Sequence, residues 1–188
     1  MTASSRIRFA TVRDLYAAFP TAEVDVGAEC CDEPSADFVS RLAEEGERRA
    51  ALSYLAYLLG RREAVWWAAR CVRQAAPNDA GSLRCLQAAD EWVSEPSEAR
   101  RRRALEEAAQ TKKSLAAAWV AQAAGWAGGN VSPDPRYFME PPPQATAQAA
   151  RGAVLIALDG VASDRRVAAQ LEWIETALRC AIGASGQS

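Results

Sequence analysis

The sequence contains no histidine, and this absence excludes several classes of active site. A Ser-His-Asp triad, a Cys-His dyad, a HExxH zinc site and a histidine-based iron site all require an imidazole ring. The cysteines also lack the CxxC spacing typical of a four-thiolate zinc site. We therefore expect a protein with no catalytic residues, no cofactor and no metal, and we predict that it is not an enzyme.

Long apolar runs are missing as well. The opening stretch MTASSRIRFATVRDL lacks the continuous apolar core of a secretory signal, and no later segment reaches the roughly 18 apolar residues of a membrane helix. The cysteines are odd in number, which favours free thiols, and we expect most of them to be small core residues. They are Cys30, Cys31, Cys71, Cys85 and Cys180. We expect a cytoplasmic protein without membrane insertion.

An excess of charge of one sign is also lacking. The 22 Lys and Arg residues nearly balance the 24 Asp and Glu residues, for a formal net charge of −2. A protein that binds nucleic acid normally carries a basic field that replaces the counterions of the phosphates. We therefore expect no nucleic-acid partner.

What the sequence does contain is helical periodicity rich in alanine. Runs of β-branched residues are scarce, and apolar residues recur at steps of three and four. We predict an all-α fold, a single domain over residues 1–188 with about eight or nine packed helices in a bundle or array. Its core is expected in the segments Leu52–Leu59, Val65–Val72 and Val154–Leu158. The stretch Thr11–Asp14 predicts a capping box at the start of the first helix.

Three segments are predicted to be irregular. Residues 21–34 (TAEVDVGAECCDEP) are acidic and typical of a loop, and residues 183–188 are expected to form a flexible tail. Residues 128–143 form a long Pro- and Gly-rich loop. Its three consecutive large apolar residues are Tyr137, Phe138 and Met139. We expect these three to anchor the loop across a helical surface.

The stretch RREAVWWAARCVR, Arg61–Arg73, places two tryptophans side by side. An α-helix turns about 100° per residue, so Trp66 and Trp67 must point to different faces. Trp67 falls at the edge of the apolar face and is predicted to lie in the core. Trp66 falls among arginines instead. These are Arg62, Arg70 and Arg73.

Two interpretations of Trp66 remain open. Another element, such as the 128–143 loop, covers the indole while the arginine stems pack along it and keep their charged ends in water. Alternatively, the indole and the arginines form an interface hot spot, because Trp and Arg are enriched where binding energy concentrates.

The run Arg100–Arg103 is surrounded by glutamates, which is typical of a solvated helix with i,i+4 ion pairs. Arg101, however, lies on the same side as Ala104 and Ala108, where a buried face is expected. A carboxylate of a partner, or a carbonyl at a helix end, is the expected counterpart of its charge. The candidate residues for binding a partner are therefore Trp66, Arg62, Arg70, Arg73 and Arg101.

Several stretches together resemble a known family. They are YLAYLLGRREAVWWAARCVR, AADEWVSEPSEARRRRALE, AAAWVAQAAGWAGGN and TAQAARGAVLIAL. In this order they resemble an uncharacterised bacterial family known as a domain of unknown function, whose most distinctive piece is RREAVWWA. Members of that family tend to be encoded near type VI secretion genes, among small proteins that help to load effectors onto the secretion spike. The resemblance implies an adaptor or chaperone-like role and adds no catalytic residues.

Three hypotheses follow. The first is a non-enzymatic cytoplasmic adaptor that binds an effector, a spike protein or a co-adaptor. The second is an immunity-type inhibitor of a cognate toxin, whose acidic segment Glu23–Glu33 mimics a substrate or masks a basic site. The third, least favoured, is an enzyme on a helical scaffold, which requires an apolar pocket with converging polar groups.

Overall fold

The structure is a computed structural model that describes residues 7–134 and 136–183. Over these residues the chain is all-α, as predicted, with ten helices and one isolated antiparallel bridge between Thr11 and Pro34. Its contacts divide it into two compact units. Unit 1 comprises the described parts of 1–60 and 163–188, and unit 2 comprises those of 61–162. Residues 184–188 of the expected tail lie outside the described residues.

Unit 1 is organised around one helix that is buried over most of its length. Its helices are α1 (Val12–Ala18), α2 (Ala22–Val26), α3 (Ser35–Glu44), α4 (Arg48–Leu58) and α10 (Ser163–Ile182). Helix α4 contacts α2, α3 and α10, and every residue from Ala51 to Leu58 is buried. This confirms the prediction that the Leu52–Leu59 segment belongs to the core.

The core of unit 1 is rich in aromatic side chains. The Tyr54 ring packs against Phe38 and Tyr16, with ring centroids 4.9 and 6.2 Å apart. The Tyr54 hydroxyl lies 2.8 Å from the Ser35 hydroxyl, so the buried polar atom is satisfied. Burial raises the pKa of Tyr54 to about 12, because the charged phenolate is disfavoured away from water.

The first helices of unit 1 both confirm and correct the predictions. The Thr11 hydroxyl accepts the Asp14 amide at 3.2 Å and the Asp14 carboxylate accepts the Thr11 amide at 3.0 Å, which is the predicted capping box. The prediction that residues 21–34 are irregular throughout is wrong, because α2 occupies 22–26. Its five residues are too few to show a helical period, and it ends at Gly27 with φ +74°. This short helix brings the total above the expected eight or nine.

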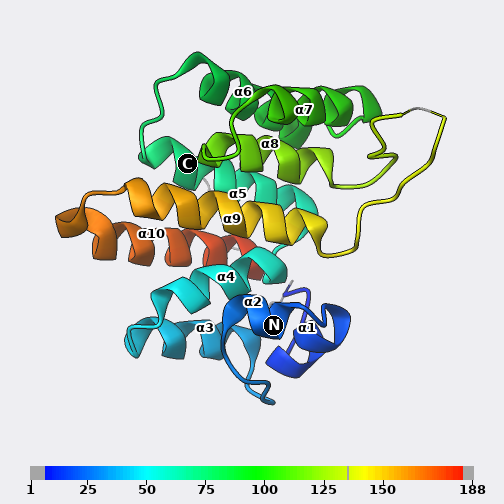
Figure 1. Ribbon diagram of the computed structural model, residues 1–188. Helices are drawn as coiled ribbons and strands as arrows, with labels where there is room; N and C mark the ends of the chain where they lie inside the picture. The colour runs from blue at the N-terminus through cyan, green and yellow to red at the C-terminus, as the bar shows by residue number, and fades with distance from the viewer. Residues whose placement is uncertain (1–6, 135, 184–188) are drawn as a thin grey trace. The chain divides into compact units, whose positions relative to one another are not determined.

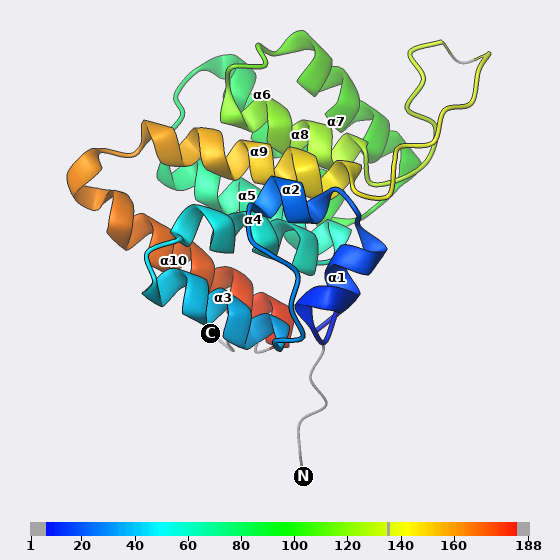
Figure 2. The same cartoon turned by 60° about the horizontal axis from the view of Figure 1, so that its bottom comes forward.

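Unit 2 is organised around a helix of small residues. Its helices are α5 (Arg61–Gln74), α6 (Ala80–Ser94), α7 (Glu98–Gln110), α8 (Ala116–Gly125) and α9 (Ala145–Gly160). Helix α8 contacts each of the other four, and in Figures 1 and 2 it lies between α9 and the α6–α7 pair. All of α8 except Ala116 and Trp119 is buried, mostly alanine. Small side chains allow neighbouring helices to approach α8 closely.

Basic side chains bind carbonyl groups near helix ends in unit 2. The Arg100 guanidinium donates to the carbonyls of Glu91 and Glu95 at the end of α6, at 3.3 and 3.2 Å. Lys113 donates to the Ala108 carbonyl near the end of α7, at 3.2 Å. Arg61 donates to the Ala127 carbonyl just beyond α8, at 3.0 Å. Each contact places positive charge near the carbonyl end of a helix, where the helix dipole favours it.

The cysteines are all free thiols, as predicted. The expectation that most of them lie in the core is wrong, because only Cys71 and Cys85 are buried. None of the described helices combines the length and the apolar character needed to cross a membrane.

Candidate protein-binding surface

The two neighbouring tryptophans of α5 have opposite environments. Trp67 is completely buried in unit 2, whereas 38% of Trp66 is exposed. This confirms the prediction from the helical projection. Part of the Trp66 indole is therefore covered by its neighbours, and part is open to solvent.

Two of the predicted arginines bind a neighbouring helix. The Arg62 guanidinium donates to the carbonyls of Val93 and Ser94 at the end of α6, at 2.5 and 3.2 Å. Arg73, two turns beyond Trp66 on α5, forms an ion pair with Asp90 of α6. Trp66 thus lies between two side chains that fasten α5 to α6. Arg62 and Arg73 have a role within unit 2, although both remain exposed at the surface.

Arg70 is the predicted arginine that remains available. Its side chain lies one turn beyond Trp66 and is exposed. Within the described part of the chain, neither the Trp66 indole nor the Arg70 guanidinium has a hydrogen-bond or ion-pair partner. Together they form the Trp66–Arg70 patch, an apolar ring beside a free positive charge.

Arg101 does not belong to the surface, and the structure corrects its place among the candidates. Only 4% of it is exposed. Its Nε and Nη2 donate to the Glu98 carboxylate at 2.8 and 2.7 Å. Its Nη1 donates to the Gly125 carbonyl at the end of α8 at 2.5 Å, and Nη2 also donates to the Asn130 carbonyl at 2.9 Å. The helix-end carbonyl expected from the sequence is present, inside unit 2.

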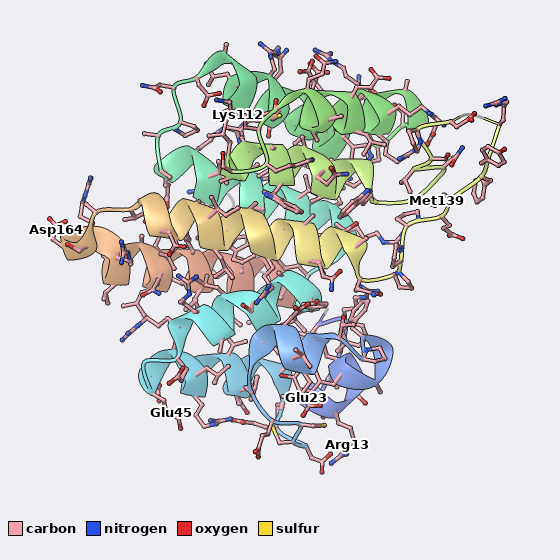
Figure 3. The ribbon with its side chains drawn as sticks, in the orientation of Figure 1. Arg13, Glu23, Glu45, Lys112, Met139 and Asp164 are labelled. Atoms are coloured by element: carbon pink, nitrogen blue, oxygen red, sulfur yellow. The ribbon has the colours of Figure 1, made fainter. Side chains whose placement is uncertain are left out.

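The apolar residues of the 128–143 loop do not anchor it. Tyr137, Phe138 and Met139 are 65%, 74% and 56% exposed. The expectation that they pin the loop across a helical surface is therefore wrong. In Figures 1 and 2 the loop extends away from the helices of unit 2, and Figure 3 labels Met139 on it. We call these three consecutive side chains the loop tip.

The loop binds to itself through one asparagine. The Asn130 Oδ1 accepts the amides of Ser132 and Met139 at 3.0 and 2.9 Å, and its Nδ2 donates to the Tyr137 carbonyl at 2.9 Å. The amide of Val131 donates to the Met139 carbonyl at 2.8 Å. The Asn130 side chain and this backbone bond together tie the two arms of the loop.

The charges of the loop are nearly neutralised. Asp134 and Arg136 form an ion pair of 2.7 Å, and their hydrogen bonds hold the pKa of the Asp134 carboxyl below its usual range. Glu140, directly after the loop tip, is exposed. The loop tip therefore presents apolar area with no surplus of positive charge.

A family model described as a family of unknown function (DUF6931) matches residues 38–181, most of the chain. The chain belongs to this family. Comparison with curated proteins and with solved structures found no match. The DUF6931 region contains all of unit 2, and so both the Trp66–Arg70 patch and the loop tip.

The acidic segment Glu23–Glu33 precedes the DUF6931 region, and several of its charges bind within unit 1. Asp32 pairs with Arg13 at 2.5 Å, which lowers the pKa of the Asp32 carboxyl. Glu33 pairs with Arg41 at 3.0 Å. Among the described residues, no three His, Cys, Asp or Glu side chains are grouped so that they hold a metal ion. The paired carboxylates are less free to bind a basic surface than the sequence suggests.

The loop tip is not among the predicted site residues, because apolar residues in a loop usually indicate burial. The sequence left open whether the 128–143 loop is a lid, a docking arm or only packing. Asn130 is the signal that distinguishes a loop with exposed apolar residues from a loop whose apolar residues are buried. An asparagine that begins a loop satisfies backbone amides by itself and gives the loop a shape without help from a helix. Charged residues on both sides of the tip, Arg136 and Glu140, are a second signal of solvent contact.

Proposed function

We propose that this member of the DUF6931 family is a non-enzymatic cytoplasmic adaptor that binds another protein through the loop tip. The observation that carries the proposal is the exposure of three consecutive large apolar side chains on a loop tied by its own hydrogen bonds. Contact with a partner removes this apolar area from water, which is the main favourable contribution to protein association. Clustered exposed apolar residues are typical of interaction sites.

The chemistry of the loop tip favours a folded protein with an apolar groove. Aromatic residues and methionine are enriched in the buried centres of protein interfaces. Anionic lipid and nucleic acid attract surfaces with surplus Lys and Arg, whereas the loop's Arg136 is neutralised by Asp134. Glu140 beside the tip favours a groove with a basic group at its edge.

The Trp66–Arg70 patch is a second contact in this proposal. A partly exposed tryptophan beside an unpaired arginine has the composition of an interface hot spot. Arg62 and Arg73 contribute indirectly, because they fasten α5 to α6 on either side of Trp66. The patch is therefore presented on a fixed helix.

For the biological setting we propose an accessory role in type VI secretion, in which the partner is an effector, a spike protein or a co-adaptor. The stretch RREAVWWA resembles the motif of a family whose members tend to be encoded near such secretion genes, and this resemblance supports the assignment. An adaptor is favoured over an immunity-type inhibitor, because the acidic segment that an inhibitor would use is partly neutralised by Arg13 and Arg41.

The test measures binding of the purified protein to each effector and spike protein encoded near its gene, by isothermal titration calorimetry. The loop-tip variant combines Tyr137→Ser, Phe138→Ser and Met139→Ser. We expect it to lose at least about tenfold in affinity, as is typical of hot-spot removal. The control is Leu83→Ser, which removes an exposed apolar side chain from α6 of the same unit. All variants are first shown to melt as the wild type does.

The outcomes separate the hypotheses. Equal affinity of the loop-tip variant and wild type for a bound partner would remove the loop tip from the proposal. Loss with Trp66→Ala but not with the loop-tip variant would assign binding to the Trp66–Arg70 patch alone. If the protein instead binds a single toxin and restores growth of cells that express it, the immunity hypothesis replaces the adaptor.

A further inference from the structure

The loop that carries the apolar tip is held to the helices of unit 2 by an ion pair whose arginine, Arg101, is buried and whose glutamate, Glu98, is exposed. The Arg101 guanidinium binds the Glu98 carboxylate with two hydrogen bonds, and its remaining donors reach the carbonyls of Gly125 and Asn130. Gly125 is the last residue of α8, and Asn130 is the residue that ties the loop. One buried side chain therefore joins the end of α8 to the base of the loop.

The contact between this ion pair and the loop leaves no free space. A Cβ atom at Gly129 would lie 2.8 Å from Glu98 Oε2 and 2.9 Å from Arg101 Nε. Gly129 also has φ +66°, which favours glycine. The backbone that enters the loop is thus pressed directly against the Glu98–Arg101 pair.

The connection continues through Asn130 to the tip. The Asn130 backbone carbonyl is held by Arg101, while its side chain binds the Met139 amide and the Tyr137 carbonyl. A change in the position of the Asn130 backbone therefore moves the side chain that determines the spacing of the two loop arms. Arg101 itself has no hydrogen bond to residues 137–139 in the described structure.

We propose that Glu98, Arg101 and Asn130 act as positioning residues that order the 128–143 loop before a partner arrives. This rests on the proposed function for its purpose, since an ordered tip avoids the entropy lost when a mobile loop is immobilised on binding. The ordering itself is a property of the free protein. Arg101, a predicted partner-binding residue, thus serves binding from within the unit without touching the partner.

The experiment measures backbone ¹⁵N order parameters of the free, full chain for the amides of Ser132, Tyr137 and Met139. In Asn130→Ala these order parameters should fall from about 0.85, the value of a rigid backbone, to below about 0.6. Trypsin cleavage after Arg136 should accelerate at least about tenfold in the same variant, because a protease cuts the opened form. The exposed Asn78 provides the control Asn78→Ala, which should change neither quantity.

The decisive comparison is Arg101→Met with Arg102→Met. Arg102 also pairs with Glu98, at 3.1 Å, but it is partly exposed and forms no hydrogen bond or ion pair with the loop in the described structure. We expect Arg101→Met to lower the order parameters at Tyr137 and Met139 and Arg102→Met to leave them unchanged. Unchanged order in a folded Arg101→Met variant would overturn the role of Arg101, and unchanged order in Asn130→Ala would overturn the whole proposal.

If Arg101→Met does not fold, Gly129→Ala perturbs the same contact from the loop side and should also lower the order of the tip. Unchanged order of the loop tip in Gly129→Ala would overturn the claim that the Glu98–Arg101 pair orders the loop. Partner affinity is measured separately. A loop that loosens as expected while the loop-tip variant binds normally would sustain the ordering and refute the proposed function. If the loop stays rigid in every variant and the loop-tip variant still loses binding, the proposed function would stand and the ordering role would be refuted.

Discussion

The two units achieve helix packing with different side chains. In unit 1 the central helix α4 is surrounded by large rings, among them Phe38 and Tyr16. In unit 2 the central helix α8 is mostly alanine, and basic side chains bind the carbonyls near helix ends. Unit 1 therefore gains stability from large apolar area, and unit 2 from close approach of helices.

The rings of unit 2 are divided between its core and its surface. Trp67 and Trp92 are buried, whereas Trp66 and the loop tip are exposed. The candidate binding surface of unit 2 therefore consists of side chains that lie outside its alanine interface.

The largest effect is expected from removing a ring of unit 1. Phe38→Ala should lower the free energy of unfolding by about 3–5 kcal/mol, because it leaves a cavity beside Tyr54. The measurement is chemical denaturation followed by circular dichroism. Phe138→Ala makes the same change at an exposed site of unit 2 and should alter stability by less than about 0.5 kcal/mol. Similar losses in both variants would contradict the contrast between the units.

A smaller effect is expected from enlarging a side chain in unit 2. A Cβ at Gly125 would lie 2.9 Å from Leu105 Cβ on α7, so Gly125→Ala should cost about 1–3 kcal/mol through overpacking. Gly152→Ala, within α9, meets only Trp119 at 3.8 Å and should stabilise by about 0.5–1 kcal/mol. Thermal melting of both variants checks the opposite signs. A neutral Gly125→Ala would show that α8 has space to spare.

High pH should weaken unit 1 through its buried tyrosine. Because the folded pKa of Tyr54 is raised from 10.0 to about 12, its contribution to stability is complete below pH 10.0 and is lost as the pH rises to about 12. Phenylalanine does not ionise, so the stability of Tyr54→Phe should fall less steeply than that of the wild type between pH 10.0 and about 12. Guanidinium denaturation at a series of pH values measures both slopes. Parallel slopes would mean that Tyr54 ionises freely in the folded protein.

The smallest effect is expected from acid on unit 2. The hydrogen bonds of Arg101 lower the pKa of the Glu98 carboxyl from its ordinary value of 4.5. Its contribution is therefore present above pH 4.5 and is lost as the pH falls through the lowered value. The melting temperature is measured at a series of acidic pH values, and in Glu98→Gln it should depend less on pH than in the wild type. Glu106 is exposed on the same helix, and the control Glu106→Gln should keep the wild-type dependence. An unchanged acid profile in Glu98→Gln would show that Arg101 is held mainly by the carbonyls.

Local features of the structure were predictable from the sequence. The capping box of Thr11 and Asp14 depends on two residues three positions apart, and the opposite environments of Trp66 and Trp67 follow from the turn of one helix. Helix α2 was missed because five residues carry no period. These successes and this failure concern neighbours along the chain.

The contacts of the arginines were not predictable in the same way. Arg62 reaches Val93, 31 positions away, and Arg101 reaches Asn130, 29 positions away. Such pairs depend on how the helices pack, which periodicity does not specify. The sequence placed Arg101 on a buried face correctly but left open whether a partner or its own chain would satisfy the charge. The role of Asn130 depends likewise on the return of the chain at Met139.

The alanine interior of α8 also affects how unit 2 responds to temperature. Alanine loses no side-chain rotamer freedom on folding, but it removes less apolar surface from water than an aromatic ring does. The heat-capacity increase on unfolding grows with the apolar surface exposed. Per residue, the region around α8 therefore contributes a smaller increase than the region around α4, and its stability varies less between cold and warm conditions.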